Sequence, residues 1–490
     1  MQDYLNQKYS INNKSYQMNK PKTELLRGLS LTAAIMIVAG SMIGSGIFRK
    51  PATMAGQLMS PELLLIVWLV AGIITFIGAL CNAEVAGMID ATGGQYIYFQ
   101  KMYGNFLAYL YGWAVFAVVQ TGAGAAIAYV FGEYLGYFIK YPQLPESIQT
   151  FSIHIPIIGD IFPFAEFGAK AAAILCIIFL TGINYVGVIF GGAVQSFVTF
   201  IKIASIVLLS ILLLTSGAGS FSNITTGFSI PSERATNIIS LFGLALAGAF
   251  WAYDGWNNLT FVSGEIKQSR RNVPLGLLWG TVIVIAVYMM INVAYLYVLP
   301  IEVMAESPLV AASAAEVVFG SYGAAIISVA VIISSFGALN GNILSTARVC
   351  FAMSKNNMFL KVLDKVHPRY ATPHTSLVAQ GLWSCLLVLT GTFDTITDYV
   401  MFASWLFYML GAYGVIVLRK KIPDVPRPYK VWGYPYTPII FVVFSFMFLL
   451  NTIISDLSNA AMGAFLILLG LPFYFWRVSK NKSDLNKSKG

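Results

Sequence analysis

Long apolar runs alternate with short polar connections along almost the whole chain. A helix that crosses a bilayer needs about 20 predominantly apolar residues, because the hydrocarbon core is about 30 Å thick. The pattern therefore predicts an all-α membrane protein with about twelve transmembrane helices. The predicted spans are 32–57, 62–88, 104–139, 166–186, 192–216, 236–262, 273–299, 322–353, 375–392, 396–418, 434–455 and 459–476.

Two of these spans are interrupted near their middle. The first contains "GSMIGSGIF", Gly40–Phe48, and the sixth contains "AYDGWNN", Ala252–Asn258. The two spans lie five apart and therefore cross in opposite senses. Paired interruptions in two inverted halves are typical of transporter binding sites. We expect a transporter core over 32–418, with inverted repeats over about 32–216 and 236–418 and with spans 11 and 12, 434–476, outside the repeat.

The composition agrees with this pattern. The 490 residues are 57% hydrophobic and only 10% charged, whereas soluble domains carry about 25% charged residues. This excludes an ordinary soluble protein. The four cysteines fall in or at the ends of predicted spans. Since no spacing typical of a metal site and no nucleophile–base set appears, we expect no metal, no cofactor and no enzymatic activity.

The net charge of +9 is distributed unevenly. With the N-terminus placed in the cytoplasm, 23 of the 30 Lys and Arg fall on the inner side, five fall on the outer side, and two lie within spans. Cationic loops resist translocation, so we expect a multi-pass protein of the cell membrane. Both tails, 1–31 and 477–490, and the loop 419–433 are expected in the cytoplasm. The basic tails then orient the chain in the lipid bilayer, and they imply no nucleic-acid partner.

The interrupted helices predict a binding site for an amino acid. A broken helix exposes N–H groups that suit a carboxylate and carbonyl groups that suit an ammonium. The alternative is a Gly/Ser patch that lets two helices approach closely. The residues expected to hold the carboxylate are Ile43, Gly44, Ser45 and Gly46, and the carbonyl groups expected to hold the amine are those near Met42, Trp251 and Asp254.

Lys202 is a charged residue in the middle of the fifth span. Such a residue is costly in a membrane and indicates function. We expect its ammonium to bond carbonyl groups of the broken first span and a hydroxyl of span 8, Ser334 or Ser335, in place of a coupling cation. A fixed structural charge, or a lysine that reaches the interface, is the alternative. The other residues expected on its inward polar face are Gln195, Thr199 and Ser205.

Several other polar or aromatic residues are weaker candidates. Trp251 is expected to close over the substrate or simply to pack in the core. Asp254 either tunes selectivity or satisfies loose backbone N–H groups. Tyr253, Asn257 and Ser404 are candidate polar groups of the pocket or a gate.

The remaining charged candidates are expected to be structural or solvated. Glu84 is expected to be a structural partner rather than a proton relay, and Glu133 is expected to be solvated near the outer interface. Arg49 and Lys50 either attract carboxylates or sit in water, and we prefer the second. Arg348 is expected to anchor the inner interface or an inner gate.

Four motifs resemble one transporter group in the same order. They are "GSMIGSGIF", "FWAYDGWNNLTFVSGEIK", "FGALNGNILSTARVCFAMSKNNMF" and "RPYKVWGYPYTP". The chain resembles the amino acid–polyamine–organocation transporters and, within them, the L-type amino acid transporter-like proteins. The resemblance covers nearly the whole chain.

This resemblance implies a LeuT-like fold with a 5+5 inverted repeat and sodium-independent amino acid transport, often by exchange. It places the substrate carboxylate on Ser45 and Gly46 and the gate on Trp251, and it matches Asn257 and Lys202 to family positions. Animal light chains of the family bond a heavy subunit through an outer-loop cysteine, which the loop 140–165 lacks, so no disulfide-linked heavy subunit is expected.

The function expected from the sequence is the exchange of neutral L-amino acids. One alternative is a proton-coupled amino acid symporter. Another is an antiporter of cationic amino acids or polyamines, whose substrates would require an acidic pocket. A membrane sensor that does not transport is the alternative from another class.

Overall fold

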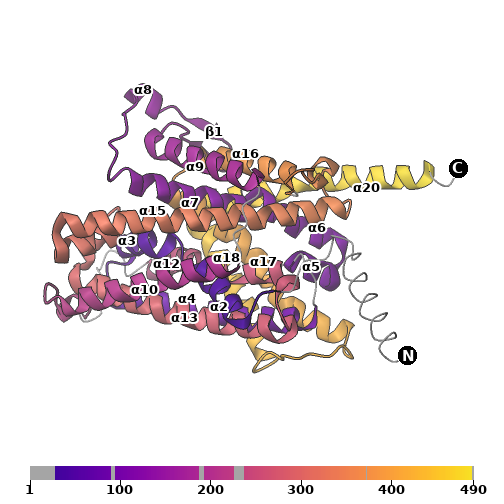
Figure 1. Cartoon of the computed structure of the whole chain (residues 1–490), viewed down its shortest axis with the longest axis horizontal. Coiled ribbons are helices and arrows are strands. Elements are labelled where there is room, and N and C mark those ends of the chain that lie inside the picture. Colours follow the sequence, from indigo (N-terminus) through magenta and orange to yellow (C-terminus); the bar gives the residue numbers. More distant parts are fainter. Residues whose placement is uncertain (1–27, 90–93, 187–191, 226–236, 371, 488–490) are drawn as a thin grey trace, which may run out of the picture.

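The computed structural model describes residues 28–89, 94–186, 192–225, 237–370 and 372–487. Most of the predicted N-terminal tail, 1–27, lies outside these residues. Long helices run side by side along the long axis of the molecule, and α20 extends beyond them at one end (Figure 1). This is the multi-pass helical fold that the hydrophobic pattern predicts.

The first five predicted spans are all helical. The first span is divided into two helices, and the third contains a five-residue π-helix in its middle. In order, the spans are α2 (Leu31–Met42) with α3 (Gly46–Leu58), α4 (Pro61–Met88), α6 (Asn105–Ala114) with η1 (Val115–Val119) and α7 (Gln120–Leu135), α9 (Phe167–Val186), and α10 (Gly192–Thr215).

The next seven predicted spans are helical as well. The sixth changes from an α-helix to a 3₁₀-helix at its break. In order, the spans are α12 (Ile238–Ala252) with η3 (Trp256–Glu265), α13 (Ser269–Val298), α15 (Val310–Lys355), α16 (His374–Val388), α17 (Phe393–Lys421), α18 (Tyr436–Ser455), and α19 (Leu457–Leu468) with α20 (Gly470–Lys487).

Ten of the described helices are long and apolar enough to cross a membrane, and the bent pair α2–α3 makes eleven. The predicted ninth span is the exception, because α16 has 15 residues and is therefore only about 22 Å long. The inverted relation between the two halves stays a prediction.

Short elements connect the spans. Two antiparallel strands, β1 (Ile153–Ile155) and β2 (Gly159–Ile161), form a hairpin between α7 and α9, in a connection for which no strand was predicted. The other connecting elements are α5 (Gln95–Tyr103), α8 (Glu146–Gln149), η2 (Phe221–Asn223), α14 (Ile301–Glu306) and η4 (Lys361–Asp364).

The helices pack in two groups. The interrupted helices α2, α3 and α12 pack mainly among α4, α10, α13 and α14, with α3 against α12, while α7, α9, α15 and α16 pack mainly against one another. The two groups meet beside the breaks, which are buried in protein. This burial makes the non-helical backbone tolerable at membrane depth, because exposed N–H and C=O groups in lipid would cost several kcal/mol each.

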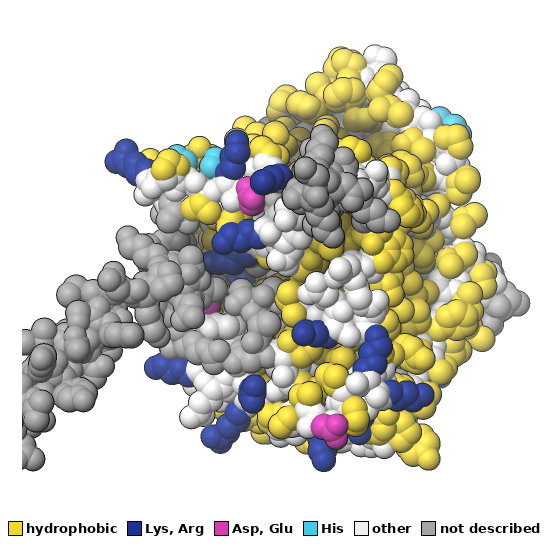
Figure 2. Space-filling view, turned by 90° about the vertical axis from the view of Figure 1, so that its right-hand side faces the viewer, with side chains coloured by type: hydrophobic (Ala, Val, Ile, Leu, Met, Phe, Trp, Pro, Cys, Tyr) yellow, Lys and Arg dark blue, Asp and Glu magenta, His cyan; other side chains and the backbone are white. Residues whose placement is uncertain are grey.

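Basic side chains surround one end of the helices. Figure 2 shows this end, where Lys and Arg predominate over Asp and Glu. Exposed basic residues of the connecting segments gather here, and we term it the predicted inner end. The opposite end, which carries the β-hairpin, is termed the predicted outer end. The exposed basic residues of the inner end include Lys101, Arg270, Lys361, Arg369 and Lys420.

Candidate functional site

The two helix breaks lie in direct contact. Helix α2 ends at Met42 and α3 begins at Gly46 after a bend of 41°. A Cβ atom on Gly46 would lie 2.6 Å from Cα of Ala252, the last residue of α12. Only glycine fits here without moving one backbone. The glycine of the first break therefore allows two helices to approach closely, and the backbone is open at the same place. The packing patch and the interrupted helix are thus compatible with each other.

Gly255 fixes the second break. Its φ of +97° is a left-handed conformation that glycine adopts without strain. A Cβ atom there would lie 2.8 Å from the carbonyl oxygen of Ser41. The turn between α12 and η3 thus packs against the last turn of α2.

Tyr288 joins the ends of both interrupted helices, and sequence reasoning missed it. Its hydroxyl lies 2.8 Å from the carbonyl oxygen of Met42 and 3.0 Å from that of Ala252. The Met42 carbonyl predicted to hold an amine is therefore already engaged by this tyrosine. Nothing in a single sequence distinguishes Tyr288 from the other aromatic residues of the spans.

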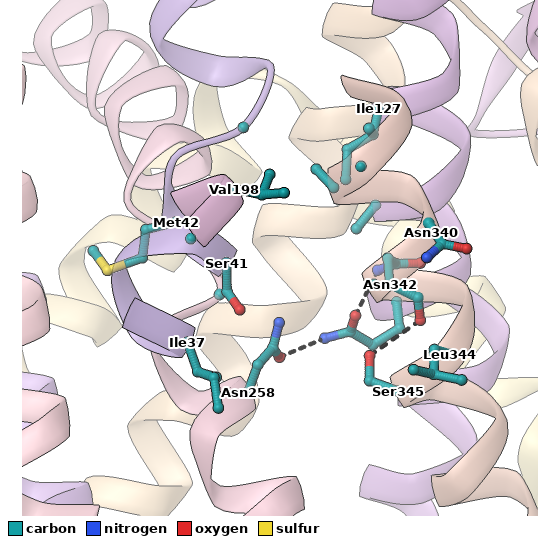
Figure 3. A pocket seen from close by; sticks show the side chains of 18 of the residues that line it. Ile37, Ser41, Met42, Ile127, Val198, Asn258, Asn340, Asn342, Leu344 and Ser345 are labelled. Atoms are coloured by element: carbon teal, nitrogen blue, oxygen red, sulfur yellow. Dashed lines mark hydrogen bonds between the residues drawn. The ribbon is translucent and has the colours of Figure 1, made fainter. Parts of the chain in front are cut away.

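A cavity of about 370 Å³ lies beside the breaks. It is lined by both interrupted helices and by residues of α7, α9, α10 and α15 (Figure 3). The structure brings together more than half of the predicted site residues around this cavity. Those that line it are Met42, Gly44, Ser45, Gly46, Lys202, Trp251 and Asp254.

The first break presents unpaired donors beside the cavity. The N–H groups of Gly44, Ser45 and Gly46 donate to no acceptor among the described residues. The Ser45 hydroxyl is buried and also lacks a partner there. Unpaired buried donors are rare in folded proteins and suggest an absent acceptor. An anionic group of a ligand fits this requirement.

Lys202 reaches the first break as predicted. Its Nζ donates to the carbonyl oxygen of Ile43 at 3.3 Å. Ser334 and Ser335 are buried on α15, but neither lines the cavity, and neither hydroxyl has a partner among the described residues. The predicted bond from Lys202 to a hydroxyl of span 8 is therefore not found in that part of the chain.

The predicted polar face of α10 is only partly inward. Thr199 is fully buried, but Ser205 is exposed, so the prediction for Ser205 is wrong. At 100° per residue, Ser205 lies about 120° from Thr199 around the helix, which is too far for one buried stripe. The side chain of Gln195 lies outside the described part of the chain.

Asp254 and Trp251 are held by residues of α17. The hydroxyl of Tyr408 donates to Oδ1 of Asp254 at 2.6 Å. The ring of Trp251 meets that of Phe393 edge to face, with 5.9 Å between centroids. Asp254 therefore has a side-chain partner as well as a place in the cavity wall, and Trp251 is both packed and cavity-facing.

Other predicted site residues stand behind the cavity wall. Tyr253 packs edge to face on Trp68 at 5.7 Å, and the Asn257 amide donates to Gln95 at 3.1 Å. Ser404 is buried in α17, and Ile43 contributes its carbonyl group while its side chain is in the core. None of these four residues lines the cavity.

A set of side-chain amides in the cavity was missed. Asn342 on α15 donates to Gln120 on α7 at 2.7 Å, and Gln120 donates to Asn258 on η3 at 3.2 Å. Nearby, Asn184 donates to Asn340 at 2.7 Å. The signal available in the sequence was the presence of amides within apolar spans, where polar side chains usually find partners across helices.

Ion pairs join three helices at the predicted outer end. Lys50 Nζ lies 2.7 Å from Asp394 and 3.5 Å from Asp398, and Arg49 pairs with Glu133 at 3.4 Å. Lys50 is 1% exposed. The predictions that Arg49 and Lys50 sit in water and that Glu133 is solvated are therefore wrong. The bend after the first break turns both basic side chains toward acids on α7 and α17.

Glu84 holds α4 to the end of α17 and to the loop before α18. Arg419 donates to both of its carboxylate oxygens, at 2.8 and 2.6 Å, and the backbone N–H of Val431 donates at 2.7 Å. Bidentate pairing of this kind fixes geometry as well as charge. These bonds agree with a structural partner role for Glu84.

The cavity extends toward the predicted inner end. Leu29, Glu265 and Arg348 belong to its lining, and all three lie toward that end. The ion pairs of Lys50 and Arg49 cross the opposite end. Ion pairs thus cross the predicted outer end, while the cavity lining extends toward the inner one.

Comparisons with known proteins cover nearly the whole chain. The family model described as amino acid permease matches residues 29–474. The serine/threonine exchanger SteT of Bacillus subtilis (strain 168) is 31% identical over 461 residues, covering 94% of this chain and 98% of the relative. The b(0,+)-type amino acid transporter 1 of Homo sapiens is 31% identical over 472 residues, covering 94% and 90%. The large neutral amino acids transporter small subunit 2 of Mus musculus is 31% identical over 458 residues, covering 92% and 81%.

Proposed function

The chain belongs to the amino acid permease family, and from this premise we propose that it exchanges neutral L-amino acids across the cell membrane, independently of sodium and by alternating access. Relatives along the full length are amino acid exchangers and transporters, which supports amino acid transport and exchange in general. Neutral substrates, sodium independence and cytoplasmic termini are the finer parts of the proposal.

The observation that carries the proposal is the set of unpaired donors at the first break. The N–H groups of Gly44, Ser45 and Gly46 and the Ser45 hydroxyl face a cavity between two groups of helices. They lie at the N-terminus of α3, whose dipole favours an anion. An α-carboxylate supplies the missing acceptor. Carbonyl groups at the end of α12 already accept a bond, as that of Ala252 does from Tyr288, so the amine would use their second lone pairs.

Lys202 supports independence from sodium. Its ammonium already contributes a positive charge at the Ile43 carbonyl, where an unwound backbone would otherwise coordinate a cation. A fixed charge in this place removes the need for a coupling ion. It also permits the alternative of proton coupling, if the ammonium loses its proton during the cycle.

Asp254 supports a second candidate, an antiporter of cationic amino acids or polyamines. Its carboxylate and that of Glu265 both line the cavity. We rank this second, because Asp254 is already engaged by Tyr408. Competition for uptake by arginine, agmatine or putrescine separates the two candidates.

Counterflow in liposomes tests the proposal. The purified chain, reconstituted alone, should take up labelled amino acid far better into liposomes preloaded with unlabelled amino acid than into empty ones. Replacing sodium by choline should leave this uptake unchanged, and activity of the single chain would show that no heavy subunit is required. Strong uptake into empty liposomes driven by a pH gradient would contradict exchange in favour of symport.

A further inference from the structure

Three side-chain amides form a directed chain of hydrogen bonds across the cavity. Asn342 Nδ2 donates to Gln120 Oε1 at 2.7 Å, and Gln120 Nε2 donates to Asn258 Oδ1 at 3.2 Å. Figure 3 shows these bonds running from α15 to η3. We term these three residues the amide relay. They join the group of helices that contains the breaks to the group that packs around α7 and α15.

The relay couples the orientation of the Asn258 amide to those of Gln120 and Asn342. Gln120 is only 4% exposed and uses both its carbonyl and its amino group within the relay. Because Oδ1 of Asn258 accepts from Gln120, Nδ2 of Asn258 remains as the end that can serve a ligand. Among the described residues Nδ2 has no acceptor, and the residue is partly exposed in the cavity wall. Chained bonds polarise one another, which strengthens the final donor.

Ser41 faces the same cavity as this free donor. Its backbone packs against Gly255, one turn before Asn258 on the sixth span. Its side chain also lines the cavity, and Figure 3 shows Ser41 and Asn258 on the same side of it. The two residues offer an amide donor and a hydroxyl close to the first break, where the substrate carboxylate is placed by the proposed function.

A donor such as Asn258 Nδ2 suits an oxygen and disfavours an ammonium. We propose that the amide relay is a side-chain subsite and that the protein prefers neutral amino acids whose side chain carries a hydroxyl or a carboxamide. Ile127, Val198 and Phe336 line the same cavity, which leaves room for a methyl group beside the polar one. This inference rests on the proposed function and names the substrate class of the same site.

Isosteric substrate pairs test the preference in the unmodified protein. Threonine and valine, serine and 2-aminobutyrate, and asparagine and leucine have nearly the same shapes but differ in hydrogen bonding. In counterflow with reconstituted protein, we expect the polar member of each pair to show at least about a tenfold higher kcat/KM, because a site built to hydrogen-bond rejects analogues that cannot. Equal exchange of both members of each pair would contradict the side-chain subsite but would still agree with amino acid exchange. No exchange of any amino acid contradicts the proposed function itself.

The variant Asn258→Leu locates the subsite. It replaces the amide by an apolar group of the same size, so the threonine-to-valine ratio should fall at least about fivefold, mainly through a higher KM for threonine. A matched control is Asn105→Leu, the same change at an exposed position away from the cavity, which should keep the wild-type ratio. If Asn258 bound the common carboxylate instead, both substrates would lose affinity equally, and the ratio would not change. Monodispersity and melting temperature of the variants show that they fold. If Asn258→Leu does not fold, the substrate pairs measured with the unmodified protein decide the proposal.

Discussion

Both the packing of the two breaks and the cavity lining require a residue without a side chain at Gly46. A methyl group there would lie 2.6 Å from Cα and 2.8 Å from Cβ of Ala252. Gly46→Ala should therefore push the two breaks apart, at a cost of about 1–3 kcal/mol typical of overpacking, and should reduce exchange strongly. Thermal unfolding and counterflow measure the two effects.

Gly44→Ala is the matched control for this prediction. A Cβ atom on Gly44 meets nothing closer than the Met42 carbonyl oxygen at 3.9 Å. This variant should keep the melting temperature of the wild type. A Gly46→Ala protein with unchanged stability and exchange would show that the breaks need not touch.

The positive charge of Lys202 at the first break is expected to be needed for exchange. Lys202→Ala removes the ammonium from the Ile43 carbonyl and should lower the exchange rate at least about tenfold, equivalent to about 1.4 kcal/mol. Folding should be largely intact, since α10 keeps its apolar contacts. Counterflow with a melting curve measures both quantities, and Lys140→Ala, at an exposed position, is the control. Wild-type rates in a well-folded Lys202→Ala protein would mean that the lysine is only structural.

At the residue scale, the sequence identified groups that are unusual for a membrane span and missed those that are ordinary. Lys202 and the glycines of the first break stood out by charge and by backbone freedom. Gln120, Asn342 and Tyr288 did not, because neutral polar and aromatic residues are common in spans and their partners come from distant helices. Asn257 was chosen because the resemblance matches it to a family position, whereas the cavity is lined by its neighbour Asn258.

At the scale of elements, the ion pairs between α3, α7 and α17 hold the predicted outer end closed. Asp394 contacts Lys50, Arg49 and Thr53. Asp394→Asn leaves Asp398 as the only charged partner of the buried Lys50 among the described residues. The free energy of unfolding of this form should therefore fall by about 1–3 kcal/mol, as expected for a charged hydrogen bond. The melting temperature of the detergent-solubilised protein should fall by several degrees.

An exposed ion pair supplies the control for Asp394→Asn. Asp160 pairs with His154 on the β-hairpin, where the two side chains are 48% and 71% exposed. Exposed pairs contribute little to stability, so Asp160→Asn should leave the melting temperature almost unchanged. Equal effects of the two variants would mean that the pairs at the predicted outer end do not stabilise this closed form.

The helices themselves were largely predictable, because apolar length sets them. The exceptions are features that the length of an apolar run does not predict. The ninth span forms only the 15-residue α16. The β-hairpin lies in a connection between spans, where the alternation of apolar and polar residues from Phe151 to Ile155 was its only signal. Arg49 and Lys50 were placed correctly beyond the break, but their burial depends on Glu133 and Asp394, which are far away in the sequence.

At the scale of the whole molecule, the cavity separates two groups of helices, and contacts across it differ at the two ends. Ion pairs of α3 with α7 and α17 cross the predicted outer end, whereas an uncharged hydrogen bond from Gln120 to Asn258 links α7 to η3 beside the cavity. Alternating access requires contacts of this kind to break on one side and form on the other. Charged pairs that are released at the outer end become solvated, which offsets part of the cost of opening.

The same separation of charge predicts how the molecule sits in the membrane. Exposed Lys and Arg gather at one end (Figure 2), and cationic loops remain in the cytoplasm, so that end and the C-terminal α20 should face the cytoplasm. Ile157→Cys on the β-hairpin, where the native side chain is 74% exposed, should react with a membrane-impermeant maleimide in intact cells. Lys361→Cys, at an exposed position of the basic end, should react only after permeabilisation. The parent protein is the control, since Cys81, Cys176 and Cys350 are buried and Cys385 is partly buried. Labelling of Lys361→Cys in intact cells would reverse the orientation and, with it, the side of the membrane toward which the cavity extends.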